Sequence, residues 1–143
     1  VMLIIGILAV VVLQRFDLLR GFDEIGYRDK VRATLEYARK SAVAQRRNVR
    51  VALAGNNLTL SIDNDVPEGG SAGTYPRSLP LPTPDRACGG ATNQICAPSS
   101  ITLAGPATLT VTPLGRPSTA GSYTVTGDAA HLITIEAETG YVH

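Results

Sequence analysis

The 143-residue chain contains no tryptophan, one methionine, two histidines and two cysteines. Zinc ribbons and disulfide-dense scaffolds need more cysteines and histidines than this, so both classes are excluded. The formal net charge of +1 argues against a dedicated nucleic-acid binder on bulk charge. With 44% hydrophobic and 17% charged residues, the composition is typical of one folded domain and not of a disordered chain.

Charge and hydrophobicity are unevenly distributed. Residues 1–50 contain ten Lys/Arg and five Asp/Glu, whereas residues 51–143 contain three Lys/Arg and seven Asp/Glu. The basic part begins with Val1–Leu13, in which no side chain is polar. The two ends of the chain therefore favour different surroundings.

The apolar segment Val1–Leu13 is short for a membrane span. As an α-helix it covers about 20 Å, against a hydrocarbon core of about 30 Å. A cleaved secretory signal needs a basic stretch before the apolar run and a small-residue site after it, and neither is seen here. A buried core helix is a second alternative, but an all-apolar helix needs a large protein around it. We interpret residues 1–26 as part of a membrane or filament-core helix whose first turns precede Val1.

The helix is expected to continue with one apolar face over 27–48. Its apolar residues recur at intervals of three and four, which is the helical period: Tyr27, Val31, Leu35, Ala38 and Ala42. Gly21 and Gly26 each cost about 1 kcal/mol relative to alanine in a helix interior. A kink or a loosened turn is therefore expected near them.

From Val49 the pattern changes to the two-residue period of strands. Val51 and Leu53, then Leu58, Leu60 and Ile62, alternate with more polar residues, and Ala54–Asn57 predicts a hairpin turn. Residues 64–100 are rich in proline and glycine and predict a long variable loop. Further strands are expected over 101–103, 107–112, 122–126 and 132–137. The fold class is α+β, a long N-terminal helix packed on antiparallel strands.

Three segments resemble a known family. Gly6–Phe16 reads GILAVVVLQRF and resembles the middle of the type IV pilin helix, with Gly6, Ile7, Leu8, Ala9, Gln14 and Phe16 at the matching places. Val31–Leu53 resembles minor pilins and pseudopilins of the GspH/FimT type, and Ile133–His143 resembles their last strand and Thr-Gly turn. The stretch between about 64 and 130 carries no resemblance.

The sequence departs from the family pattern in three places. The signature with an N-terminal Phe and a nearby Glu is absent, and we expect it to precede Val1. The usual proline before Arg-Phe is Gln14. The DNA-binding members carry Gly-Arg-x-Arg near the terminus, where this chain has Gly140–His143 without arginine.

The resemblance implies a structural subunit, a minor pilin or pseudopilin of a type IV pilus (including the mannose-sensitive-haemagglutinin, or MSHA, type) or of a type II secretion pseudopilus. The implied partners are other pilin subunits, the bacterial inner membrane before assembly and the prepilin peptidase. The implied location is that membrane, then the periplasm or an extracellular filament. A major pilin and a DNA-binding minor pilin of natural transformation are the alternatives.

The two cysteines, Cys88 and Cys96, lie in the predicted loop. In an exported domain we expect a disulfide between them, which would stabilise the fold by about 2.5 kcal/mol. A pair of free thiols is the alternative. A metal site is not expected, because zinc takes four ligands and no histidine is near in sequence.

The basic residues around the end of the helix are the strongest binding signal: Arg39, Lys40, Arg46, Arg47 and Arg50. Phosphates of DNA would favour such a patch. The alternatives are a solvated helix face and pairing with acids of neighbouring subunits.

No motif predicts catalysis or a cofactor. Asp63 and Asp65 lack the rest of a calcium-loop pattern and are interpreted as a solvated turn. His131 has no nucleophile context and is interpreted as a strand-edge residue. We therefore expect a protein that is not an enzyme.

Overall fold

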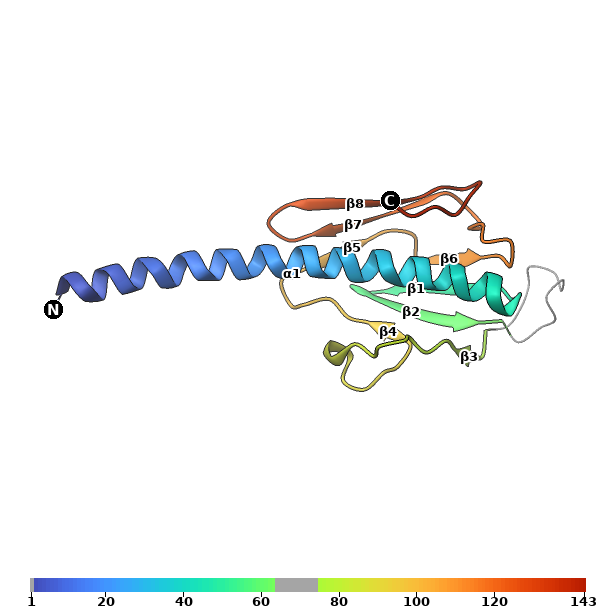
Figure 1. The fold of residues 1–143 in the computed structure, drawn as a ribbon, viewed down its shortest axis with the longest axis horizontal. Coiled ribbons are helices and arrows are strands. Elements are labelled where there is room, and N and C mark those ends of the chain that lie inside the picture. Colours follow the sequence, from blue (N-terminus) through green and yellow to red (C-terminus); the bar gives the residue numbers. More distant parts are fainter. Residues whose placement is uncertain (1, 64–74) are drawn as a thin grey trace.

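The computed structural model describes residues 2–63 and 75–143. One long helix, α1 (Met2–Gln45), runs along a head made of two antiparallel sheets (Figure 1). The N-terminal part of α1 projects beyond the head, and its C-terminal part lies across the strands. This arrangement is the α+β fold predicted from the sequence.

The first sheet has five strands and is built around the predicted hairpin. β1 (Val49–Ala54) pairs with β2 (Asn57–Ile62), and Gly55 takes a positive φ of 62° in the turn between them. β6 (Thr108–Val111) lies on the other side of β1. The hairpin prediction from Ala54–Asn57 is confirmed.

The segment predicted as a loop over 64–100 contains regular structure in its described part. β3 (Arg77–Ser78) and β4 (Gln94–Ile95) both pair with β2, and η1 (Arg86–Cys88) is a 3-10 helix between them. Short pieces of this kind escape sequence patterns, because the partner strand supplies the hydrogen bonds. Residues 64–74, including Asp65, lie outside the described residues.

The second sheet has the order β5-β7-β8. Its strands are β5 (Thr102–Ala104), β7 (Gly121–Thr126) and β8 (Ala130–Ile135). Their bounds, and those of β6, differ from the predicted ones by one or two residues, because the ends depend on pairing partners. The chain end folds back on β8, where Ile135 and Val142 form a bridge, and the turn needs the positive φ of 68° at Gly140.

The core lies between α1 and the sheets. The predicted helix stripe is buried throughout, from Tyr27 at 2% exposure to Ala42 at 0%. It packs against inward-facing strand residues of both sheets, among them Val49, Val51 and Leu109 of the first and Tyr123, Val125 and Ile133 of the second. Burial of this apolar face is what holds the helix on the head.

Two predictions about the helix are wrong. It ends at Gln45 and not at Asn48, because Arg46 turns to a φ of 53° and the Arg47 N–H reaches back to the Ala42 carbonyl at 3.2 Å. It also continues as α-helix through Gly21 and Gly26 without a loosened turn. A cost of about 1 kcal/mol per glycine is too small to interrupt a helix whose neighbouring turns are intact.

No helix in the described part of the chain combines the length and apolar content that a membrane span requires. Gly6, Ile7, Leu8, Ala9, Gln14 and Phe16 all belong to α1. Their side-chain surroundings lie outside what the structure describes.

Candidate assembly surface

The head is fastened to α1 by a buried carboxylate near the point where the helix leaves the sheets. Glu24 is 3% exposed and accepts the N–H of Asp128 at 2.8 Å and that of Ala129 at 3.2 Å. His131 Nε2 lies against the same carboxylate. The turn between β7 and β8 is thereby tied to the helix.

The electrostatics of Glu24 favour the ionised form. Burial raises the pKa of Glu24, but the hydrogen bonds from Ala129, Asp128 and His131 lower it more, so the net pKa lies below the usual range. Gly127 leaves the room for this contact, since a Cβ there would lie 2.6 Å from Glu24 Oε2. No sequence motif identified Glu24. His131 is a residue of β8, as expected from the sequence, and it also contacts Glu24 of the helix.

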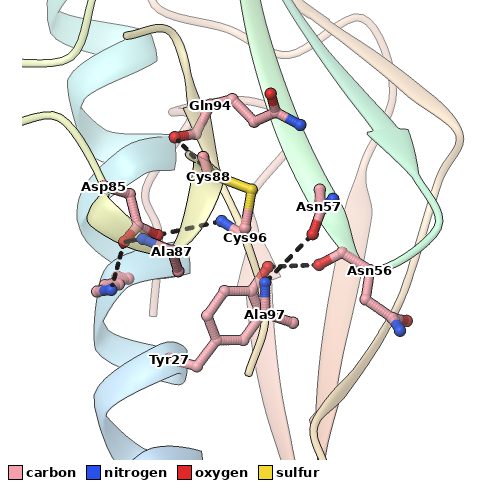
Figure 2. The surroundings of a disulfide bond; sticks show 10 residues. Tyr27, Asn56, Asn57, Asp85, Ala87, Cys88, Gln94, Cys96 and Ala97 are labelled. Carbon is pink, nitrogen blue, oxygen red and sulfur yellow. Dashed lines mark hydrogen bonds and ion pairs between the residues drawn. A yellow bond between two sulfur atoms is a disulfide. The ribbon is translucent and has the colours of Figure 1, made fainter. Parts of the chain in front are cut away.

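The two cysteines form the predicted disulfide. Cys88 and Cys96 are joined, with their Cα atoms 5.3 Å apart, and the bond links the last residue of η1 to the residue that follows β4 (Figure 2). The segment lies beside α1 and packs Ile95 into the core. The disulfide therefore shapes the surface next to the helix.

Asp85 connects the disulfide segment to the helix. Its carboxylate accepts the Ala87 N–H at 3.2 Å, the Cys96 N–H at 3.1 Å and Lys30 Nζ of α1 at 3.0 Å (Figure 2). Burial raises the pKa of Asp85, but the hydrogen bonds from Cys96, Lys30 and Ala87 together lower it by more. The net pKa therefore lies below its usual range. Asp85 acts both as the N-cap of η1 and as the partner of the helix lysine.

A groove lies between α1 and this segment. Its volume is about 520 Å³. Tyr37, which lines it, donates its hydroxyl to the Pro80 carbonyl at 2.7 Å. The walls of this helix–loop groove come from Lys30, Ala33, Thr34 and Tyr37 of the helix and from Leu81–Arg86 and Ile95. The groove is largely apolar, with Lys30 and Arg86 as its cations.

The helix also carries apolar side chains that the head leaves uncovered. Phe22 is 70% exposed and Ile25 is 46% exposed, on either side of the exposed Asp23. Both lie within two residues of Glu24, which contacts the turn between β7 and β8. Because they are three residues apart, they lie on one side of α1 and form an apolar surface, which we call the Phe22–Ile25 surface.

The five predicted basic residues do not form one patch. Lys40 and Arg46 are exposed, but Arg39 packs its side chain against Gly115 and Gly140. The Arg47 side chain donates to the Asp63 carbonyl at 3.2 Å. Asp63 itself is 3% exposed, so its interpretation as a solvated turn residue is wrong.

Arg50 lies apart from the helix end. It alternates with buried Val49 and Val51 on β1 and therefore points to the opposite face of the sheet. There its guanidinium lies 3.9 Å from the centre of the Tyr75 ring. A contiguous basic surface would need all five side chains on one face, and the strand geometry prevents this.

The arrangement of helix and sheets is found in solved structures. The type IV minor pilin FimU of Pseudomonas aeruginosa matches with a TM-score of 0.56 and 20% identity, over 80% of this chain and 82% of that chain. The minor pseudopilin EpsH of the type 2 secretion system of Vibrio cholerae matches with a TM-score of 0.59 and 12% identity, over 85% of this chain and 94% of that chain. The fold is therefore that of the pilin class.

Sequence comparison narrows the class to a family. Residues 29–139 match the family described as type II transport protein GspH, and this range is well over half of the chain. The chain belongs to the GspH family. The comparison with curated proteins finds no match.

Family and fold together confirm the resemblance predicted from the sequence. The protein is a structural subunit of the minor pilin and pseudopilin type, of a type IV pilus or a type II secretion pseudopilus. Membership of this family implies assembly with other subunits of the pilin class.

Proposed function

We propose that this subunit is held in the inner membrane by its N-terminal helix and then moves into a filament, where α1 packs against the helices of other subunits. The observation that carries the proposal is the projecting half of α1, which begins with the apolar stretch Met2–Leu13 (Figure 1). The head covers α1 only from about Glu24 onward among the side chains described. An apolar helix leaving lipid for a bundle stays in apolar surroundings, so packing can drive the exchange.

Processing by the prepilin peptidase is part of the same proposal. The peptidase would cleave the precursor on the N-terminal side of the apolar helix, and the new N-terminus would then enter the filament core. The head would lie in the periplasm and later on the filament surface. Oxidising conditions there keep the Cys88–Cys96 bond closed.

Quantitative mass spectrometry of sheared surface filaments and of the membrane fraction tests this function. Trace amounts of the chain beside a more abundant pilin would support a minor subunit, and dominance in the filaments would make it a major pilin. Presence only in membrane and periplasm would favour a secretion pseudopilus. The absence of a processed N-terminus from every fraction would contradict the proposal.

DNA binding is the weaker candidate, favoured only by the exposed Lys40 and Arg46 near the end of α1. It requires duplex binding at physiological salt that weakens steeply as salt rises. Lys40→Ala with Arg46→Ala should then reduce binding, whereas Arg86→Ala, away from the helix end, should leave it unchanged. Salt-insensitive or undetectable binding would rule this function out.

A further inference from the structure

The first half of β8 is an open sheet edge. β8 is the last strand of the second sheet, and the C-terminal segment covers only its second half, where Thr134 and His143 exchange both backbone hydrogen bonds, at 2.8 and 3.0 Å. Backbone groups alternate in direction along an antiparallel strand, and β7 and β8 pair without a break in register. Since Thr134 points away from β7, Leu132 and Ala130 do too. Among the residues that the structure describes, none bonds to the outward backbone groups of Leu132 and Ala130.

Two other strand edges of the head are closed. On β6, the Ser118 N–H donates to the Thr110 carbonyl at 2.7 Å, and on β5 the Asn56 side chain accepts the Leu103 N–H at 3.1 Å. Proteins also discourage a further strand with a proline, a lysine or a bulge on the edge. The stretch Ala129–Leu132 contains none of these. The open part of β8 is therefore able to accept a strand.

The side chain at this edge is apolar. Leu132 is 63% exposed, whereas its neighbour Ile133 faces the core, so Leu132 points to the outer face of the second sheet. A strand added antiparallel to β8 would place one of its side chains beside Leu132, with the two Cβ atoms about 5 Å apart. An apolar side chain at that place would remove Leu132 from water.

We propose that the open edge of β8, Ala130–Leu132, accepts an extended segment of a different pilin-class subunit as an added antiparallel strand. The contact deepens the assembly function and rests on it. The added strand continues the ladder that His143 begins on the second half of β8. Its backbone bonds to Ala130 and Leu132 supply the attachment, and a bulky apolar residue opposite Leu132 supplies the selectivity.

A second copy of this chain is a poorer occupant. Antiparallel pairing of two β8 edges places a twofold axis between them, perpendicular to the sheet. Because α1 runs along the head, the two helices would then point in opposite directions (Figure 1). Subunits that share one membrane and one filament have parallel helices. Since the family implies partners of the pilin class, the added strand comes from a different subunit.

Photo-crosslinking in the full chain, in cells that assemble the filament, tests the contact. A benzophenone amino acid replaces Ala130, which is exposed and points to the same face as Leu132. Illumination should give an adduct with one other pilin-class subunit, and mass spectrometry of the joined peptides identifies that subunit and its segment. The same amino acid at Leu114, 80% exposed between β6 and β7, is the control and should not give this adduct.

Two substitutions at Leu132 separate the backbone from the side chain. Adding Leu132→Pro removes the outward N–H and should lower the adduct yield by roughly fivefold or more. No described residue uses this N–H, so the unfolding midpoint of the head should stay the same. Adding Leu132→Thr keeps the N–H and should lower the yield only about twofold. If the proline variant unfolds the head, Leu132→Lys replaces it, because an edge lysine opposes strand addition.

No adduct, an adduct between two copies of this chain, or an equal adduct from Leu114 would overturn the proposal. So would a yield that Leu132→Pro leaves unchanged or lowers no more than Leu132→Thr. Sheared filaments from the same cells separate the two levels of inference. Filaments that contain the chain without the Ala130 adduct leave the assembly function intact and remove only the edge contact. An adduct formed by a chain without a processed N-terminus would contradict the assembly function instead.

Discussion

The Glu24 carboxylate of α1 accepts the backbone N–H of Asp128 at 2.8 Å, across 104 residues of sequence. The contact closes the head against the helix at the point where the helix begins to project. A carboxylate that holds two backbone N–H groups and a histidine cannot be replaced by a neutral group without loss.

Substitution of Glu24 should loosen this attachment. Glu24→Ala removes the acceptor and leaves the N–H groups of Asp128 and Ala129 unpaired, so the unfolding midpoint should fall, and Glu24→Gln should lower it less. Because bonding lowers the folded-state pKa, the contribution is complete above the ordinary value of 4.5 and is lost as pH falls through the lower folded-state value. Thermal unfolding followed by circular dichroism from pH 7 to pH 3 measures this.

The matched control for Glu24 is Glu138→Gln, an exposed carboxylate on the last turn. It should leave both the midpoint at pH 7 and its decline at acid pH unchanged. If the unfolding midpoint falls equally with pH in the wild type and in Glu24→Gln, Glu24 is not the source of the pH dependence of stability.

The disulfide should contribute measurably to stability. Cys88→Ser/Cys96→Ser should lower the free energy of unfolding by about 2.5 kcal/mol in the chain-entropy model, because the closed segment is short. Urea unfolding of the wild type with and without reductant gives the same comparison. If reductant also lowers the midpoint of the double-serine variant, the effect does not come from this bond.

Asp85 and Lys30 should contribute unequally to the free energy of unfolding, although they form one ion pair. Asp85→Ala leaves the Cys96 N–H without its acceptor and should cost about 1–3 kcal/mol. Lys30→Met should cost at most about 1 kcal/mol, since the lysine side chain is 51% exposed and surface pairs are weak. A double-mutant cycle in chemical denaturation separates the pair energy from the capping role, and equal losses for the two single variants would refute the unequal assignment.

Loss of the hydroxyl should change the free energy of unfolding differently for the two most buried tyrosines. Burial raises the pKa of Tyr123 to about 12, and among the described residues its hydroxyl has no hydrogen-bond partner. Tyr123→Phe should therefore change stability by less than about 0.5 kcal/mol or increase it. The free energy of unfolding from urea titration measures this.

Tyr27 provides the matched comparison. Its hydroxyl donates to the Asn56 carbonyl at 2.6 Å, so Tyr27→Phe should cost about 1 kcal/mol. A loss for Tyr123→Phe as large as for Tyr27→Phe would indicate that the Tyr123 hydroxyl is satisfied in solution.

Local patterns in the sequence determined the helix, its buried stripe and the first hairpin. The three- and four-residue spacing of apolar side chains from Tyr27 to Ala42 and the turn at Gly55 depend on neighbouring residues alone. Periodicity and turn chemistry therefore suffice to predict them. The GspH/FimT resemblance rests partly on the same segments and partly on the C-terminal segment Ile133–His143. The short strands β3 and β4 could not be predicted, because pairing with β2 creates them.

Only the tertiary structure decided which polar groups meet. The partners of Glu24 are backbone N–H groups, which every non-proline residue carries and no motif marks. Lys30 and Asp85 lie 55 residues apart, and the basic residues that are adjacent in sequence separate at the junction of α1 and β1. Periodicity reveals which side of an element is apolar, whereas the contacts across the head depend on how helix and sheets pack, and that is not written in any local stretch of the chain.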